Sequence, residues 1–200
     1  MSHFQGVGHR RNAGPSFTQD PPPSCPLIGK PDLHSLEKPV IAAVNGMAYG
    51  VRFSLALACD VILASEKARF CRVFVHVGLA PDAGSTYFLP RMIGTARTFP
   101  LIFSGEPIGV QEALARGLVR KVVPGEKLPE EALALAKKLA QGPTRAMGLA
   151  KKLVYTGLGK SHSDQLDEKA NDQTIGRLTE DHREGLRAFK EKRSPKFQGK

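Results

Sequence analysis

The chain has 200 residues, of which 41% are hydrophobic and 24% charged, enough for one ordinary globular domain with its own core. No apolar run reaches about 18 residues, so we expect no transmembrane helix, and the polar N-terminus indicates no secretory signal. The net charge of +10 has two interpretations. It could serve a polyanionic partner such as nucleic acid, or it could be a basic surface that faces solvent. We favour the surface, because no aromatic-rich RNA-binding strand accompanies the basic residues.

The number and spacing of the cysteines indicate the redox compartment and whether a metal site is expected. The three cysteines, Cys25, Cys59 and Cys71, are odd in number and form no CxxC pair. A disulfide framework or a zinc site is therefore not expected, and a reducing compartment is the default. We expect the cytoplasm, or the mitochondrial matrix if the source is eukaryotic, and no bound metal.

The N-terminal half predicts alternating strands and turns. Residues 1–32 are rich in Gly, Pro, Ser, His and Arg without a hydrophobic period, so we expect a disordered or poorly packed segment. Residues 38–45 (KPVIAAVN) form an apolar, β-branched run that predicts a buried strand of the parallel type. A helix is favoured over 53–58, a second buried strand over 60–64, and a short extended piece over 68–74.

From residue 81 onward the sequence becomes helical. Helices are predicted over 107–118, 129–142, 144–157 and 179–192. The second of these has proline and two acids in its first turn, two lysines in its second half and a glycine stop, as the helix dipole favours. The chain therefore predicts an α/β core at 33–142, followed by a helical region at 143–200.

One turn carries a pattern suited to anion binding. After the first strand come Asn45-Gly46, a small-residue turn and a helix that starts near Val51. Free backbone N–H groups at a helix start bind negative charge, and a thioester that becomes an enolate needs such a donor. From these residues alone, an ordinary strand-to-helix turn is the favoured interpretation.

Four blocks of sequence carry a family resemblance. They are KPVIAAVNGMAYGVRFSLALACDVILASEKARF, GLAPDAGSTYFLPRMIG, SGEPIGVQEALARGLVRKVVP and EDHREGLRAFKEKRSPKF. In order and spacing they resemble the crotonase (enoyl-CoA hydratase/isomerase) superfamily, closest in pattern to the isomerases of phenylacetate degradation. The resemblance extends from Leu36 to the C-terminus.

The resemblance implies a spiral of ββα units, assembly into homotrimers or hexamers, and an acyl-CoA thioester substrate without a separate cofactor. It implies an oxyanion hole of two backbone N–H groups, one of them that of Val51 after Gly50. The other belongs to an upstream Ala-Gly segment that residues 1–32 do not match convincingly. We therefore expect the crotonase-like spiral to be incomplete at its N-terminus.

The same resemblance bears on the reaction. Hydratases of the family carry glutamates at the positions of Ser54 and Phe74, and adding water across a double bond uses two carboxylates. Asp82 matches the aspartate that moves a proton in the isomerases. A partly buried aspartate would have a raised pKa suited to that role. A turn residue after Pro81 is the alternative interpretation of Asp82.

Further contacts are implied around the substrate. Lys192 matches a lysine offered to the CoA ribose phosphate, although a solvated helix end explains it equally well. Arg52 replaces a small residue of the glycine turn, where it would narrow the acyl tunnel or meet a phosphate. The substrate-binding positions implied are Ala48, Gly50, Pro81, Gly84 and Lys192.

Two functions follow from these expectations. The first is an isomerase that shifts the double bond of an unsaturated acyl-CoA, with Asp82 as base and acid and the Val51 N–H as oxyanion donor. The alternative is a catalytically impaired crotonase-fold protein that binds acyl-CoA or partners without turnover. We expect no membrane partner and no nucleic-acid partner for either.

Overall fold

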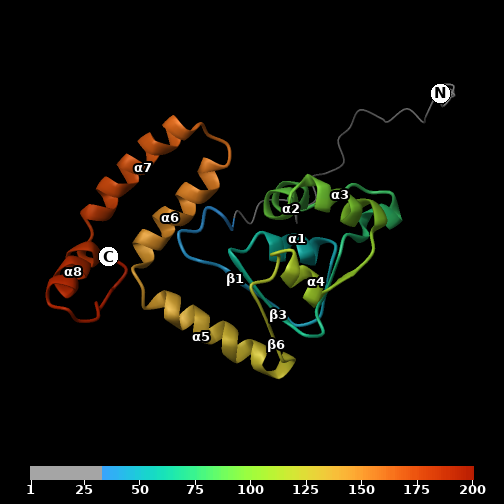
Figure 1. The fold of residues 1–200 in the computed structure, drawn as a ribbon, viewed down its shortest axis with the longest axis horizontal. Helices are drawn as coiled ribbons and strands as arrows, with labels where there is room; N and C mark the ends of the chain where they lie inside the picture. Colours follow the sequence, from blue (N-terminus) through green and yellow to red (C-terminus); the bar gives the residue numbers. More distant parts are fainter. Residues whose placement is uncertain (1–32) are drawn as a thin grey trace, which may run out of the picture. The chain divides into compact units, whose positions relative to one another are not determined.

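The structure, a computed structural model, describes residues 33–200, and the expectation for residues 1–32 lies outside them. Strands and helices alternate at first and helices then follow one another (Figure 1). The elements are β1 (Ile41–Val44), β2 (Met47–Tyr49), α1 (Val51–Leu57), β3 (Val61–Ser65), β4 (Arg69–Cys71), η2 (Val73–Val77), α2 (Ser85–Ile93), α3 (Thr95–Ser104), β5 (Ile108–Gly109), α4 (Val110–Ala115), β6 (Lys121–Val123), η3 (Gly125–Lys127), α5 (Leu128–Ala140), α6 (Thr144–Gly157), α7 (His162–Arg177) and α8 (Glu180–Lys190).

The strands form two small sheets. The first has the order β1-β3-β6 and is parallel throughout, with Ile41 opposite Val61 and Val44 opposite Ala64. The second has the order β2-β4-β5, with β2 and β4 parallel and β5 antiparallel. Only Asn45-Gly46 separates β1 from β2, so the chain passes from one sheet to the other within a single turn. Two consecutive strand pairs each precede helical structure, β1 and β2 before α1, and β3 and β4 before η2 and α2.

Alternate residues of the first sheet face opposite sides, as a period of two requires. One side packs on α5 through Leu128, together with Ile41, Val61, Leu63 and Val123. The other side enters the main core, with α1 and α4 lying over it (Figure 1); its residues include Ala42, Val44, Ile62, Ala64 and Val122. Burial on both faces explains the continuous apolar run of β3. The expected burial of the first strand is only partial, because no residue of β1 is fully buried and Ala43 is exposed.

The structure confirms the predicted α/β class and the helical C-terminal region, and it adds elements that the sequence pattern did not indicate. Strands β2 and β6 have three residues each and β5 has two, too few to show a period. The extended piece expected over 68–74 ends at Cys71, and a 3-10 helix follows. Helix α7 has few apolar residues to reveal its face. The domain boundary at residue 142 remains a prediction. Among residues 33–200, no helix is long and apolar enough to cross a membrane.

A buried polar cluster fastens α6 to the α/β core. Asp60, between α1 and β3, accepts from the backbone N–H of Val40 at 2.7 Å and from the Tyr155 hydroxyl at 2.8 Å. The ammonium group of Lys151 lies 2.8 Å from the same carboxylate, and its side chain is only 7% exposed. It also donates to the carbonyl oxygens of Leu33 and Lys38. Burial and the bond to Asp60 raise the pKa of Tyr155.

Removing the Asp60 carboxylate should destabilise the fold strongly. Asp60→Ala leaves the buried Lys151 ammonium without its counter-charge, which costs about 3–5 kcal/mol of unfolding free energy. Glu37→Ala is the matched control, because the Glu37–Arg145 ion pair lies at the surface and such pairs contribute about 1 kcal/mol or less. Urea denaturation of the two variants measures the difference. Equal losses would show that the Asp60 cluster does not anchor α6.

Candidate functional site

Gly50 makes the turn on which the candidate site depends. It is buried between β2 and α1 with φ +56° and ψ −124°, a conformation that residues with a side chain rarely adopt. Its N–H donates to the carbonyl of Cys71 at 3.1 Å, which joins the ends of β2 and β4. A Cβ here would lie 3.5 Å from Val73 and 3.7 Å from the ring of Phe74. Phe74, at a position where the resemblance places a hydratase glutamate, thus packs against the turn.

The helix after this turn starts with an unoccupied donor. The N–H groups of Phe53 and Ser54 both bind the Gly50 carbonyl, at 3.1 and 3.2 Å. Within residues 33–200 no acceptor takes the N–H of Val51, as is usual in a first helical turn. Val51 is exposed at the surface, and its N–H is the donor that the resemblance assigns to the oxyanion hole.

The loop that carries Asp82 has an unusual backbone. Ala83 and Gly84 both have left-handed φ values, +53° and +75°, and α2 begins at Ser85. A Cβ on Gly84 would meet the Phe88 ring at 2.9 Å, so glycine is required there. The half-buried Asp82 carboxylate accepts from the N–H of Ala83 at 2.5 Å. Its other carboxylate oxygen forms no bond to residues 33–200 and can face a substrate.

A buried serine and a buried arginine connect the two halves of the site. The hydroxyl of Ser54 donates to the backbone carbonyl of Asp82 at 2.8 Å. Arg72 donates from Nη1 to that hydroxyl at 2.9 Å, and its guanidinium carbon lies 4.3 Å from the centre of the Phe53 ring. Arg72 is 1% exposed, and burial lowers the pKa of its guanidinium to about 10.

Sequence reasoning missed Arg72. The signal that could have pointed to it is a single cation within the apolar stretch Phe70 to Val75. Ser54 was noted only as a position without an acid. Its hydrogen bonds show that it joins α1 to the Asp82 loop.

The structure brings six of the seven expected site positions into two adjoining segments. Ala48, Gly50 and Val51 lie along β2 and the start of α1, and the Ser54–Asp82 bond links them to the loop that holds the other three. Ala48 is 4% exposed and belongs to the core, so any substrate contact there would come from its backbone. The loop positions are Pro81, Asp82 and Gly84. The roles of all six remain predictions.

Lys192 stands apart from the other six positions. It follows α8 in an exposed turn with φ +53°, and α8 packs on α7. No hydrogen bond or ion pair joins it to α1 or to the Asp82 loop within the described residues.

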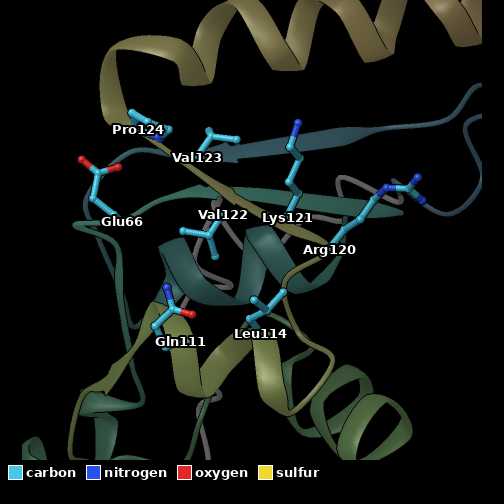
Figure 2. A pocket seen from close by; sticks show the side chains of 8 residues that line it. All are labelled: Glu66, Gln111, Leu114, Arg120, Lys121, Val122, Val123 and Pro124. Atoms are coloured by element: carbon cyan, nitrogen blue, oxygen red, sulfur yellow. The ribbon is translucent and has the colours of Figure 1, made fainter.

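A shallow hollow of about 600 Å³ lies elsewhere, along the β6 edge of the first sheet (Figure 2). Arg120 and Lys121 stand on one side of it and Glu66 on the other, and none of the expected site residues lines it. The ammonium group of Lys121 already pairs with Glu131 at 2.8 Å. Residues 33–200 contain no cluster of His, Cys, Asp or Glu suited to a metal ion. The candidate site is therefore identified by the hydrogen bonds around Ser54 and not by this hollow.

A sequence model of the enoyl-CoA hydratase/isomerase family matches residues 30–200. The chain belongs to the enoyl-CoA hydratase/isomerase family. It is 41% identical over 168 residues to a probable enoyl-CoA hydratase of Rhodobacter capsulatus and 39% identical over 175 residues to the 1,2-epoxyphenylacetyl-CoA isomerase of Escherichia coli. These alignments cover 84% and 88% of the chain, and the chain spans 65% and 66% of the two relatives.

Solved structures confirm the fold. Enoyl-CoA hydratase subunit I of Geobacillus kaustophilus superposes with a TM-score of 0.81 at 39% identity, covering 84% of this chain and 65% of that one. An enoyl-CoA hydratase of Bacillus anthracis gives a TM-score of 0.80 with the same identity and the same coverage. The expected crotonase-like fold is therefore shown, and members named hydratase and isomerase both share the family.

The glycine turn provides a test of the site's backbone. Gly50→Ala forces a side chain into a backbone conformation that costs roughly 1–3 kcal/mol, so its unfolding free energy should fall by that amount. Gly109→Ala is the control, because Gly109 has φ −77° and open space around a Cβ, and it should lose nothing. Denaturant titration compares the two. An undiminished stability of Gly50→Ala would contradict the assigned turn.

Proposed function

We propose that the protein is an isomerase that shifts the double bond of an unsaturated acyl-CoA by proton transfer. The supporting observation is the set of side chains at the three positions where the family places acids. Ser54 is buried and bonded to Arg72 and to the Asp82 carbonyl, and Phe74 packs near Gly50. Asp82 alone carries a carboxylate. One carboxylate suffices to move a proton between two carbons, whereas hydration uses two.

In the proposed reaction, the thioester oxygen accepts the N–H of Val51. The Asp82 carboxylate removes a proton from the carbon between the double bond and the thioester, and the electrons move into a dienolate whose charge lies on the thioester oxygen. The backbone donor stabilises that charge. The protonated Asp82 then returns the proton to the far end of the dienolate. Substrate and product are isomers, so the reaction uses no cofactor.

The names of the relatives support the reaction class without selecting one reaction. The Escherichia coli relative is a 1,2-epoxyphenylacetyl-CoA isomerase, and a relative of Streptococcus mutans, 37% identical, is a trans-2-decenoyl-[acyl-carrier-protein] isomerase. The Rhodobacter relative is a probable hydratase. The choice of isomerase therefore rests on Ser54, Phe74 and Asp82.

Acyl-CoA binding without turnover is the second candidate function. The observation that favours it is the exposed Arg52 beside Val51, at a position where the resemblance places a small residue. A large cation there would narrow the acyl tunnel or meet a phosphate, so that a thioester is held without reaching the geometry that proton transfer needs.

The proposal includes assembly into a homo-oligomer, a trimer or a hexamer. Helices α7 and α8 and the turn between them leave large apolar side chains exposed, and a second copy of the chain would cover them: Leu166, Ile175, Leu178, Leu186 and Phe189. Phe189 is 84% exposed and lies close in sequence to Lys192. In such an assembly, Lys192 would meet the CoA ribose phosphate of a neighbouring subunit.

Asp82→Asn should abolish isomerisation. Asparagine keeps the shape of aspartate but cannot accept and return a proton, and general acid–base groups contribute roughly 10²–10⁴-fold in rate. The absorbance change on converting a 3-enoyl-CoA to its conjugated 2-enoyl isomer measures the rate, with Asp167→Asn, an exposed residue of α7, as control. Full activity of Asp82→Asn would refute the assignment. Hydration of a 2-enoyl-CoA faster than isomerisation would refute the proposed reaction.

Acyl-CoA thioesters should bind more tightly than the corresponding free acids. The phosphates of CoA meet a chain of net charge +10, so binding should weaken as salt screens that attraction. Calorimetry with butyryl-CoA and with butyrate at two salt concentrations tests this without turnover. Binding of butyryl-CoA together with inactivity in both enoyl-CoA assays would support the second candidate function. Absent or equal binding of the two compounds would contradict both candidate functions.

A further inference from the structure

The hydroxyl of Ser54 takes part in a hydrogen-bonded chain whose direction is determined by chemistry. A guanidinium group can only donate, so the 2.9 Å contact with Arg72 Nη1 uses a lone pair of the hydroxyl. The single hydroxyl proton is then available to the Asp82 carbonyl at 2.8 Å, a shorter contact than the 3.4 Å to the Gly50 carbonyl. The chain runs from Arg72 through Ser54 to Asp82.

Burying Arg72 at this position is expected to lower the stability of the fold. The arginine forms no ion pair with an acidic side chain of residues 33–200, and its Nε and Nη2 atoms have no partner there. A buried charge without a counter-charge costs several kcal/mol, and apolar replacements of buried charges are often neutral or stabilising. The stacking on Phe53 recovers only part of such a cost. A role other than stability would explain this arginine.

The Asp82 loop is the part of the site that needs support. Ala83 has a left-handed φ without being glycine, a conformation that persists only where surrounding contacts hold it. A hydrogen bond donated by a hydroxyl that itself accepts from a cation is stronger than one donated by an ordinary hydroxyl. The contact from Ser54 is therefore well suited to hold the Asp82 peptide and, through it, the direction of the carboxylate.

We infer that Ser54 and Arg72 are positioning residues, which hold the Asp82 carboxylate in a fixed relation to the Val51 N–H. Ser54 lies one turn after Val51 on the same helix, α1. That helix therefore carries the oxyanion donor and, through Ser54, the anchor of the proton-transfer loop. The inference rests on the proposed function and adds to it the residues that align its two groups.

The kinetic test uses Arg72→Met and Ser54→Ala, with Ser65→Ala as control. Ser65 is also fully buried and donates to a backbone carbonyl, that of Asn45. We expect kcat for isomerisation to fall roughly tenfold in both test variants, as for a misplaced catalytic group, with KM little changed. The Tm of Arg72→Met should stay or rise, and Ser54→Thr should restore kcat. A fall in Tm that parallels kcat, or an unchanged kcat in both variants, would overturn the inference.

A second measurement does not depend on activity. The N–H groups of Ala83 and Ser85 are bonded within the Asp82 loop, so hydrogen exchange followed by mass spectrometry reports its order. Ser54→Ala should accelerate exchange in peptides that span residues 80–86, and Ser65→Ala should not. If the unmodified protein isomerises nothing, the proposed function fails while this result still decides whether Ser54 holds the loop. Unchanged exchange in Ser54→Ala would refute the inference even if Asp82→Asn is inactive.

Discussion

The arrangement of the site depends on one buried hydroxyl group. Ser54 is fully buried on α1 and bonds at once to a side chain that follows β4 and to the backbone of the Asp82 loop. Within residues 33–200, the other two donors to the Asp82 carbonyl are the hydroxyl and the N–H of Ser85, at the start of α2. Ser54 is therefore the donor that comes from a different element. In the described part of the chain, Ser54 is thus the one side chain that hydrogen-bonds the helix beginning with Val51 to the Asp82 loop.

The two-sheet architecture explains why these residues meet. Strands β2 and β4 are parallel neighbours, so their carboxyl ends lie side by side, and Gly50 and Arg72 are the residues that follow them directly. The bond from the Gly50 N–H to the Cys71 carbonyl closes the gap between the two ends. Because the strands have three residues each, few contacts are available to set this geometry. The left-handed turn at Gly50 supplies the direction in which α1 leaves the sheet.

The features that could be predicted from the sequence are those set by neighbouring residues, and the features that could not are contacts between distant residues. The strand near 60–64 was predicted because β3 is buried on both faces, which leaves a continuous apolar run. The run at 38–45 also predicted a strand, although β1 is only partly buried. The turn before Val51 was indicated by local glycine chemistry. The Ser54–Asp82 bond spans 28 positions and depends on tertiary packing, so no local pattern reveals it. A buried arginine resembles an exposed one in sequence, since its burial is decided by partners such as Phe53 that come from another element.

The charges of the side chains at positions 54, 72 and 74 also suit the proposed reaction. Arg72 contacts the carbonyl of Gly50 at 3.4 Å, and that carbonyl belongs to the same peptide group as the Val51 N–H. A cation beside the carbonyl draws electron density through the peptide and makes its N–H a better donor. A glutamate in place of Ser54 would offset that charge, and a glutamate in place of Phe74 would add a second negative group near the turn. With serine and phenylalanine there, no carboxylate at these two positions offsets the charge of Arg72 beside the Gly50–Val51 peptide, which suits the Val51 N–H to its proposed role as oxyanion donor.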